Sequence, residues 1–226
     1  MELMANGLAG HEHNFFRYVN QSSWLGGNQE YSSLNEGFPY WFNGLVPLAY
    51  GLDDDRLKAQ VQQAADYIIS HAAPDGWIGP ETTPETRNFW ARYPAFLGLT
   101  QLAEADPGQA DKVIPAMHKF FDLMHTMLAD NYTGYTMHPG DLFDAQWGRA
   151  RDHDMIISLQ WMYENYPGNN SQILLDNMKF LNDEAFDWSA WFSPGMYIKA
   201  DLDTVSLDIT TKDFPFEHGV NAGQGL

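Results

Sequence analysis

The stretch NEGFPYWFNGLVPLAYGLDDDRLKAQVQQAADYIISHAAPDGWIGP, residues 35–80, decides the fold class. From Trp41 to Leu52 it is apolar nearly all round, which is typical of a helix on the inside of a helical assembly. Asp53–Asp55 supplies an N-cap for a second helix, Arg56–Ala73, whose apolar residues recur at helical spacing. The stretch therefore predicts a helical hairpin. Pro47 is expected to bend the first helix or to delay its start.

Two further helical hairpins follow the first. The second is predicted from Thr86 to Ala105 and from Pro107 to Asp130, with proline in a first turn that tolerates it. The third is predicted from Leu142 to Tyr166 and from Asn170 to Trp188. Residues 190–212 instead alternate apolar and polar side chains, which favours an extended segment or a small β-hairpin. The sequence predicts an all-α fold of consecutive hairpins, which suits a ring whose loops build an open, sugar-sized pocket.

Composition narrows the class of ligand. The chain has 226 residues, of which 44% are hydrophobic and 15% aromatic, so a packed core is expected. Its net charge of -18, with only 12 Lys and Arg, argues against nucleic acid or an anionic membrane as partner. The absence of cysteine excludes disulfides, thiolate nucleophiles and Cys-bound zinc within these residues. A neutral ligand such as a carbohydrate fits this composition better than an anion does.

Targeting signals are weak. The N-terminus lacks the basic start and apolar core of a signal peptide. No apolar run approaches the roughly 20 residues that a membrane span needs. Three Asn-x-Ser/Thr sequons, at Asn20, Asn131 and Asn169, weakly favour secretion. The opening residues resemble a helix already in progress, so further sequence is expected upstream.

The first candidate cluster lies at the start of the first predicted helix. Glu36, Tyr40, Trp41 and Asn43 combine rings that can stack on a sugar with groups that bind hydroxyls. The alternative is that these aromatic residues fill gaps in the core.

The second candidate cluster follows the first hairpin. It contains Trp77, Glu81, Trp90, Arg92 and Tyr93. An inward-facing arginine on an apolar helix needs either a carboxylate or a ligand. A structural Arg–Glu pair is favoured over direct contact with substrate.

The third candidate cluster, WGRARDHD at 147–154, is the densest ionisable stretch. The residues singled out for ligand binding are Trp147, Arg149, Asp152, His153 and Asp154. Arg151 and Asp154, three apart, would share a helix face. Asp152 and Asp154 are two apart and point to different faces, so they cannot form an opposed glycosidase pair. The alternative is a salt-bridge network that orders the helix start.

The fourth candidate cluster is His218 with Asn221, three residues on, which would share a helix face around a ligand hydroxyl. A capping or core role for the histidine is the more common case. No metal site is predicted, because His11 with His13 and His118 with His125 lack a shared face or a supporting carboxylate set.

Several segments carry a resemblance to a known family. They are NEGFPYWFNGLVPLAYGLDDDRLKAQV, PDGWIGP, WARYPAFLGLTQLAEA, WGRARDHDMIISLQWMYE and HGVNAGQGL. On these the chain resembles glycoside hydrolase family 127, the β-L-arabinofuranosidase-like group, and most of all its fungal secreted branch. The resemblance runs from Glu2 over nearly the whole chain, and the first and last segments are its most specific parts.

The resemblance implies an (α/α)6 barrel, of which residues 1–226 would form roughly the first half as one partial domain. It implies retaining hydrolysis of terminal arabinofuranosyl units, with a Cys nucleophile on a zinc ion and a Glu acid/base. These groups would lie beyond Leu226, so this chain would supply pocket walls without the catalytic centre or the zinc. The full-length protein would be extracellular.

Single positions extend the resemblance. Tyr93 matches a substrate-side tyrosine, His218 matches a pocket histidine, and Asp154 matches an acidic helix start loosely. A histidine of the family falls near Leu97, which departs from the pattern. The alternative to a glycosidase fragment is an inert sugar-binding or truncated paralogue. A helical-repeat scaffold is disfavoured, because solenoids rarely gather Trp, Arg and His at one rim. Half a ring would leave apolar helix faces uncovered, so self-association is expected.

Overall fold

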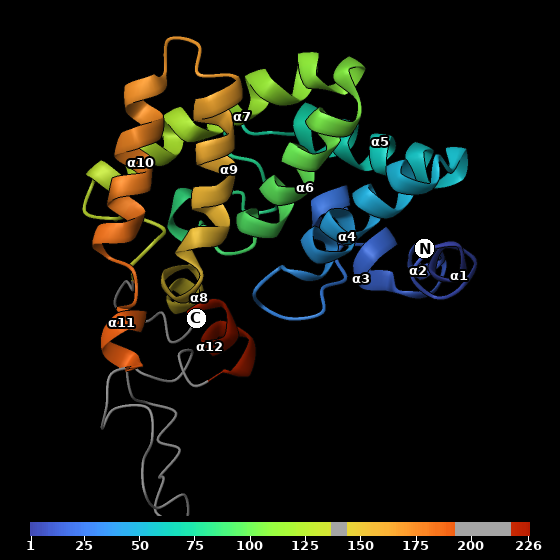
Figure 1. The fold of residues 1–226 in the computed structure, drawn as a ribbon, viewed down its shortest axis with the longest axis horizontal. Coiled ribbons are helices and arrows are strands. Elements are labelled where there is room, and N and C mark those ends of the chain that lie inside the picture. The colour runs from blue at the N-terminus through green and yellow to red at the C-terminus, as the bar shows by residue number, and fades with distance from the viewer. Residues whose placement is uncertain (137–143, 193–217) are drawn as a thin grey trace, which may run out of the picture.

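The computed structural model describes residues 1–136, 144–192 and 218–226, without the side chains of 144–146. This part of the chain is helical and contains no β-strand (Figure 1). The all-α prediction is confirmed for it. Of the extended segment predicted near 190–212, the first residues close a short helix at Trp188–Trp191, and residues 193–217 lie outside the described part.

Six long helices make up most of the fold. They are α4 (Gly37–Leu52), α5 (Asp55–Ser70), α6 (Arg92–Ala105), α7 (Pro107–Ala129), α9 (Asp152–Asn165) and α10 (Ser171–Asp183). The shorter helices are α1 (Glu2–Asn6), α2 (Glu12–Phe15), α3 (Arg17–Asn20), α8 (Asp144–Ala150), α11 (Trp188–Trp191) and α12 (Gly219–Gln224). Two 3₁₀ turns lie at Ser23–Leu25 and Pro84–Thr86.

The predicted N-cap at the start of α5 is confirmed. Asp54 is the N-cap and its side chain accepts a hydrogen bond from the backbone N–H of Leu57 at 3.1 Å. Such a cap satisfies one of the free N–H groups of a first turn. Leu57, Val61 and Ile68 are buried, as their spacing predicts.

Three helix starts differ from the prediction. α4 begins at Gly37 and runs through Pro47, so the late start expected there is wrong. The proline cannot donate to the carbonyl of Asn43, whose side chain and carbonyl instead accept from Gln101 Nε2 of α6 at 2.5 and 3.5 Å. α6 begins at Arg92, after a 3₁₀ turn. The first helix of the third hairpin is divided at Arg151, whose backbone is not helical (φ -130°, ψ 25°).

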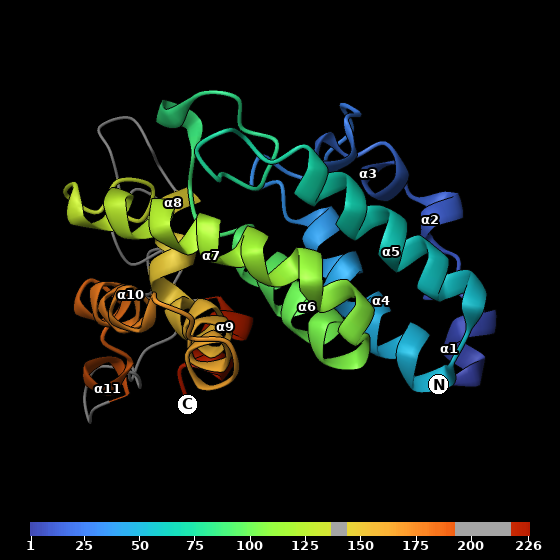
Figure 2. The same cartoon turned by 90° about the horizontal axis from the view of Figure 1, so that it is seen from above.

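The hairpins α4–α5, α6–α7 and α9–α10 follow one another across the molecule (Figures 1 and 2). Helices α4, α6 and α9 contact each other in that order, and α5, α7 and α10 pack behind them in the same order. The ring centroid of Phe96 on α6 lies 4.5 Å from that of Phe120 and 5.3 Å from that of Phe121, both on α7. Each fully buried ring of this kind contributes roughly 1.5–3 kcal/mol.

Helices α4, α6 and α9 all begin at the same end of the molecule. At that end Glu36 accepts from Trp90, and Arg151 donates to Tyr40. At the opposite end the hydroxyl of Tyr50 donates to Asp106, and Trp161 donates to Glu104. We call the end where these three helices begin the rim.

The N-terminal segment packs on the first hairpin rather than continuing a long helix. Arg56 of α5 donates to the carbonyls of Gly10 and Ala5 at 2.7 and 3.1 Å, which ties α1 and its following turn to the body. None of the helices in the described residues is both long and apolar enough to cross a bilayer.

Candidate functional site

The centre of the rim is the guanidinium of Arg151, at the break between α8 and α9. Its Nη2 donates to the hydroxyl of Tyr40 at 3.0 Å and its Nη1 donates to Asn221 Oδ1 at 3.2 Å. Its Nε donates to Asp154 Oδ2 at 3.3 Å. One side chain that is 5% exposed therefore joins α4, α9 and α12. A planar guanidinium suits this role because its donors point in several fixed directions.

Aromatic rings surround this guanidinium. Its central carbon lies 4.8 Å from the Trp90 ring, and cation–π contacts of this kind are attractive. Tyr40 meets Trp90 edge-on at 6.2 Å between centroids, and Trp147 lies 6.1 Å from Trp90. Trp90 Nε1 donates to Glu36 Oε2 at 2.7 Å.

We define the rim cluster by the residues that these contacts join. They are Glu36, Tyr40, Trp90, Trp147, Arg151, Asp154, His218 and Asn221. The cluster unites the first, third and fourth predicted groups with one residue of the second. Tyr40 is 42% exposed and His218 is exposed, so the cluster reaches the surface.

α12 completes the cluster from the far end of the sequence. His218 is its N-cap residue, and its ring meets Trp147 edge-on at 5.1 Å. Asn221 is fully buried, and Gln224 Nε2 donates to Asp154 Oδ1 at 3.0 Å. His218 therefore caps the helix that contains Asn221, beside the ionisable stretch, but Asn221 binds Arg151 rather than pointing at an open pocket.

The environment of Tyr40 at the rim favours the neutral form of its hydroxyl. Burial raises the pKa of the Tyr40 hydroxyl, and the charge of Arg151 acts in the opposite direction. The hydroxyl therefore stays protonated at neutral pH. It accepts from Arg151 and keeps its own proton available to donate.

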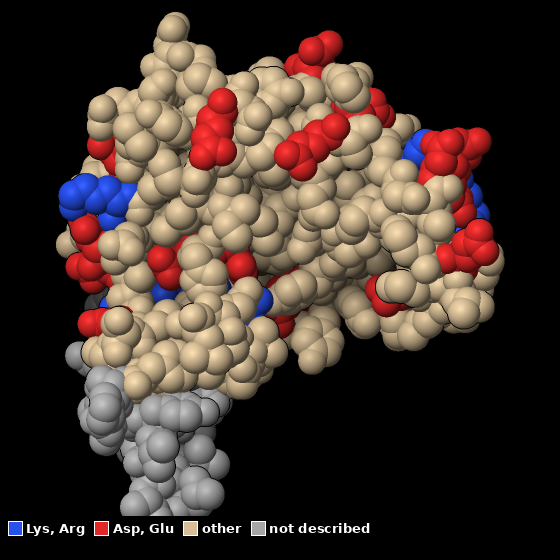
Figure 3. All heavy atoms as spheres, in the orientation of Figure 1, with Lys and Arg blue, Asp and Glu red and all other residues tan. Residues whose placement is uncertain are grey.

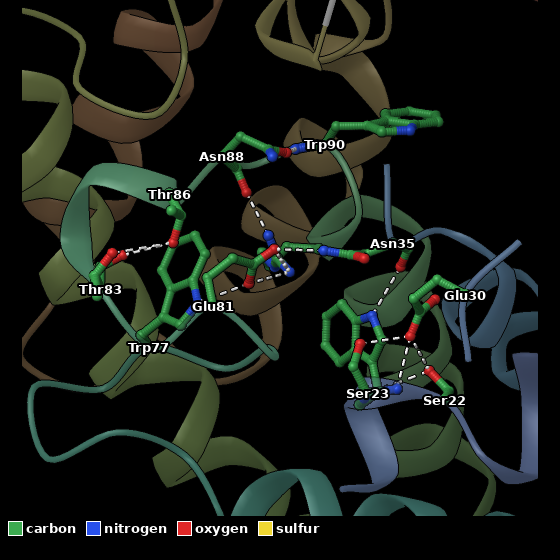
Figure 4. Close-up of polar contacts among 12 residues, drawn as sticks. Ser22, Ser23, Glu30, Asn35, Trp77, Glu81, Thr83, Thr86, Asn88 and Trp90 are labelled. Carbon is green, nitrogen blue, oxygen red and sulfur yellow. Dashed lines mark hydrogen bonds and ion pairs between the residues drawn. The ribbon is translucent and has the colours of Figure 1, made fainter. Parts of the chain in front are cut away.

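The second predicted cluster belongs to the core. Arg92 is 0% exposed and its Nη2 donates to both carboxylate oxygens of Glu81, at 2.9 and 2.8 Å. Figure 4 shows this carboxylate near the ring of Trp77. Its guanidinium lies 4.6 Å from the ring of Trp77, which is also fully buried and donates to Glu81. The structural Arg–Glu pair is thus the alternative that is observed. A ligand could reach Trp77 or Arg92 only after a rearrangement.

Room for this ion pair depends on Gly79. A β-carbon there would lie 2.6 Å from Arg92 Nη2 and 2.8 Å from Glu81 Oε2, and the residue has φ +152°. Both facts favour glycine. The turn at Gly79 therefore leaves room for a buried guanidinium.

Tyr93 lies beneath the rim. Its side chain is fully buried, and its hydroxyl has no hydrogen-bond partner within the described residues. Burial raises its pKa well above the ordinary tyrosine value, with smaller contributions from Tyr135, Asp152 and Asp154. A β-carbon on Gly148 would sit 3.1 Å from the hydroxyl, so the close approach of α8 favours glycine there.

Three other predicted residues have structural partners. Trp41 is buried, with its ring 5.8 Å from that of His13. Asn43 faces α6 through Gln101 rather than the rim. Arg149 Nε donates to the carbonyl of Glu184 at 2.6 Å, between α8 and the end of α10.

Asp152 and His153 form a pair at the start of α9. His153 Nδ1 lies 3.5 Å from Asp152 Oδ1, and its Nε2 is buried without a partner among the described residues. The contact with Asp152 raises the pKa of His153, while burial acts in the opposite direction. A raised folded-state pKa stabilises the fold below the unfolded pKa of about 6.5, and this stability is lost as pH rises through the folded pKa.

We therefore expect His153→Gln to lower the free energy of unfolding at pH 5.5 and to have less effect at pH 8.5. The difference should stay below about 1 kcal/mol, because the contact is long and the ring partly exposed. Urea unfolding at both pH values measures it. In an Asp152→Asn background, His153→Gln should have the same effect on the free energy of unfolding at both pH values. An NMR titration that places the His153 pKa below about 6.5 would contradict the prediction.

A groove of about 450 Å³ adjoins the rim cluster, between the N-terminal segment and α4. Its polar and aromatic lining residues are Glu12, Tyr18, Tyr31, Glu36, Tyr40 and Trp41. Glu36 and Tyr40 belong to both the groove and the rim cluster, so the two are continuous.

The described surface offers little to anions or metals. Asp and Glu outnumber Lys and Arg on the face shown in Figure 3. No three His, Asp or Glu side chains within the described ranges gather closely enough to hold a metal ion.

The sequence predicted Trp90 in the second cluster but did not predict Arg151 as a ligand-binding residue. The spacing of Arg151 and Asp154 was a usable local signal. The partners that make Arg151 central lie 111 and 70 residues away, at Tyr40 and Asn221, and no local pattern indicates them.

Comparison with known proteins leaves the family resemblance a prediction. A scan against family models and searches of curated proteins and of solved structures found no match to this chain.

Proposed function

We propose that the rim cluster binds a terminal arabinofuranosyl unit or a similar neutral sugar, as part of a glycoside hydrolase-like protein of carbohydrate metabolism. The observation that carries the proposal is the convergence of Tyr40, Asp154 and Asn221 on Arg151, beside exposed aromatic surface. Sugar sites combine an aromatic face for the ring with fixed polar groups for the hydroxyls.

The individual residues support this chemistry. Tyr40 offers a half-exposed ring for stacking and a hydroxyl proton to donate. Glu36 has one carboxylate oxygen on Trp90 and a second that can accept from a sugar hydroxyl. His218 is exposed at the start of α12, against the edge of Trp147.

The fold proposal is that these hairpins are part of an (α/α)6 toroid. Support comes from the parallel course of α4, α6 and α9 and from the outer helices packed behind them in the same order. In such a ring the shared rim would face a central pocket. Inner-helix faces that no partner covers would favour self-association, measurable by sedimentation velocity.

The zinc–cysteine centre implied by the family does not fit the residues present. The 226 residues contain no cysteine, and the described part has no cluster of metal ligands. We therefore assign only binding and pocket-wall roles to this chain, and propose that hydrolysis requires residues outside it. The same absence favours a second candidate, a sugar-binding protein without hydrolytic activity. An extracellular location is part of the glycosidase proposal.

Titration of the intrinsic tryptophan fluorescence with methyl L-arabinofuranoside tests the proposal. Trp90 and Trp147 lie in the rim cluster, so binding should change the emission, with a dissociation constant in the millimolar range typical of one sugar unit (about -4 kcal/mol). Tyr40→Ala should weaken binding at least about fivefold. Tyr163→Ala, an exposed tyrosine near the opposite end of α9, should not. Absence of saturable binding by the wild type would reject the proposal.

Hydrolysis is tested on the same samples with p-nitrophenyl arabinofuranoside. Binding without release of nitrophenol is expected for this chain alone, which agrees with both candidates. Turnover would show that a catalytic centre exists within these residues, and the assignment of pocket walls only would then be wrong.

A further inference from the structure

The floor of the groove beside the rim cluster is open at Gly44, inside α4. Glycine is among the least favourable residues in a helix interior, because it loses the most backbone freedom on folding. A β-carbon at Gly44 would have no heavy atom within 4 Å, so no contact in the described structure requires glycine there. The residue is exposed and lines the groove.

Two other glycines of the long helices have a packing reason, whereas Gly219 and Gly223 of the short α12 do not. A β-carbon at Gly37 would lie 2.9 Å from the Tyr18 ring, and one at Gly98 would lie 2.6 Å from the ring of Phe42. Gly44 has no such neighbour. Its effect is to leave a bare strip of backbone on the groove floor, where a ligand can approach closely.

The chemistry of the lining selects the ligand. Glu12 and Glu36 provide carboxylates, and Tyr18, Tyr31 and Tyr40 provide rings. No Lys, Arg or His contributes to this lining. Carboxylates accept hydrogen bonds from sugar hydroxyls, whereas a uronic acid would meet like charge in the groove. The nearest cation, Arg151 of the rim cluster, is buried and already paired with Asp154.

We propose that the groove is a second sugar subsite, which takes the next unit of a neutral oligosaccharide against the backbone at Gly44 and rejects uronic acids. The inference rests on the proposed function, because Glu36 and Tyr40 line both the groove and the rim cluster. A volume of about 450 Å³ beyond the cluster leaves room for an additional sugar ring.

The test compares methyl L-arabinofuranoside with 1,5-linked L-arabinobiose by isothermal titration calorimetry. The wild type should bind the disaccharide at least about fivefold more tightly. Gly44→Leu should remove this difference and leave the monosaccharide affinity unchanged. Gly44→Ala should reduce the difference and raise the melting temperature by about 2 °C, since only the ligand, not the fold, uses the glycine.

Gly223→Ala is the matched control, because a β-carbon there also has no neighbour within 4 Å and the residue lies outside the groove, near the end of α12. It should leave both affinities unchanged. Digalacturonate, as the anionic probe, should not bind detectably.

The possible failures are distinguishable. Equal affinity for the two neutral sugars, a Gly44→Leu variant that still prefers the disaccharide, or binding of digalacturonate would overturn the subsite while the rim proposal stands. Absence of binding by either neutral sugar would overturn both.

Discussion

Replacement of Glu81 by alanine is expected to lower the free energy of unfolding by about 3–5 kcal/mol, the largest single effect in the molecule. The substitution leaves the guanidinium of Arg92 fully buried, where it loses both carboxylate contacts. Burial lowers the pKa of Arg92, but not enough for the group to become neutral. The charge therefore remains in the core without its partner. Trp77 loses an acceptor as well.

Urea unfolding followed by circular dichroism measures this loss. Lys179→Ala is the control, since it breaks an ion pair with Asp183 in which the lysine is 70% exposed, and it should change stability by less than about 0.5 kcal/mol. A Glu81→Ala protein within about 1 kcal/mol of the wild type would mean that the pair is not buried in solution.

Replacement of Arg151 by methionine is expected to cost about 3 kcal/mol and to release α12 from the body. The change leaves Asp154 and Asn221 buried without their shared donor. Asp154 keeps the hydrogen bond from Gln224, but its buried carboxylate loses its cationic partner, and such a loss is strongly destabilising. Arg151→Lys keeps the charge but cannot direct donors to three partners at once, so it should recover less than half of the loss.

Hydrogen exchange distinguishes this local release from general destabilisation. In Arg151→Met, the amides of Gly219–Gln224 should exchange markedly faster. Exchange of the amides in α5 should change only by the amount that the loss of global stability predicts. Lys112→Met, which breaks an exposed pair with Asp66, is the control and should leave α12 unchanged. Unaltered exchange in α12 would show that Arg151 does not hold it.

The sequence predicted the helices better than their ends. The N-cap at Asp54 and the buried stripe of α5 follow from contacts within a few residues, so they could be read from spacing alone. The break at Arg151 could not, because its non-helical backbone serves partners on α4 and α12. α4 likewise continues through Pro47, and the carbonyl of Asn43 that the proline cannot reach is 3.5 Å from Gln101 Nε2 of a neighbouring helix.

The candidate site was predicted as separate clusters, and only some of them meet. Glu36 and Tyr40 join Asp154 at the rim, whereas Trp77 and Arg92 turn into the core. Arg92 follows Trp90 by two residues and Arg151 follows Trp147 by four, so a nearby aromatic residue does not distinguish the core arginine from the rim arginine. The difference arises because Glu81 reaches Arg92 from a neighbouring turn, 11 residues away.

By itself, the sequence determined the helical class, the hairpin order and the residue types available for chemistry. These depend on periodicity, caps and composition, which act over one or two helical turns. The tertiary structure alone decided which charge is structural and which reaches the rim. That choice depends on hydrogen bonds that join residues as far as 111 positions apart, and these form only when the helices pack.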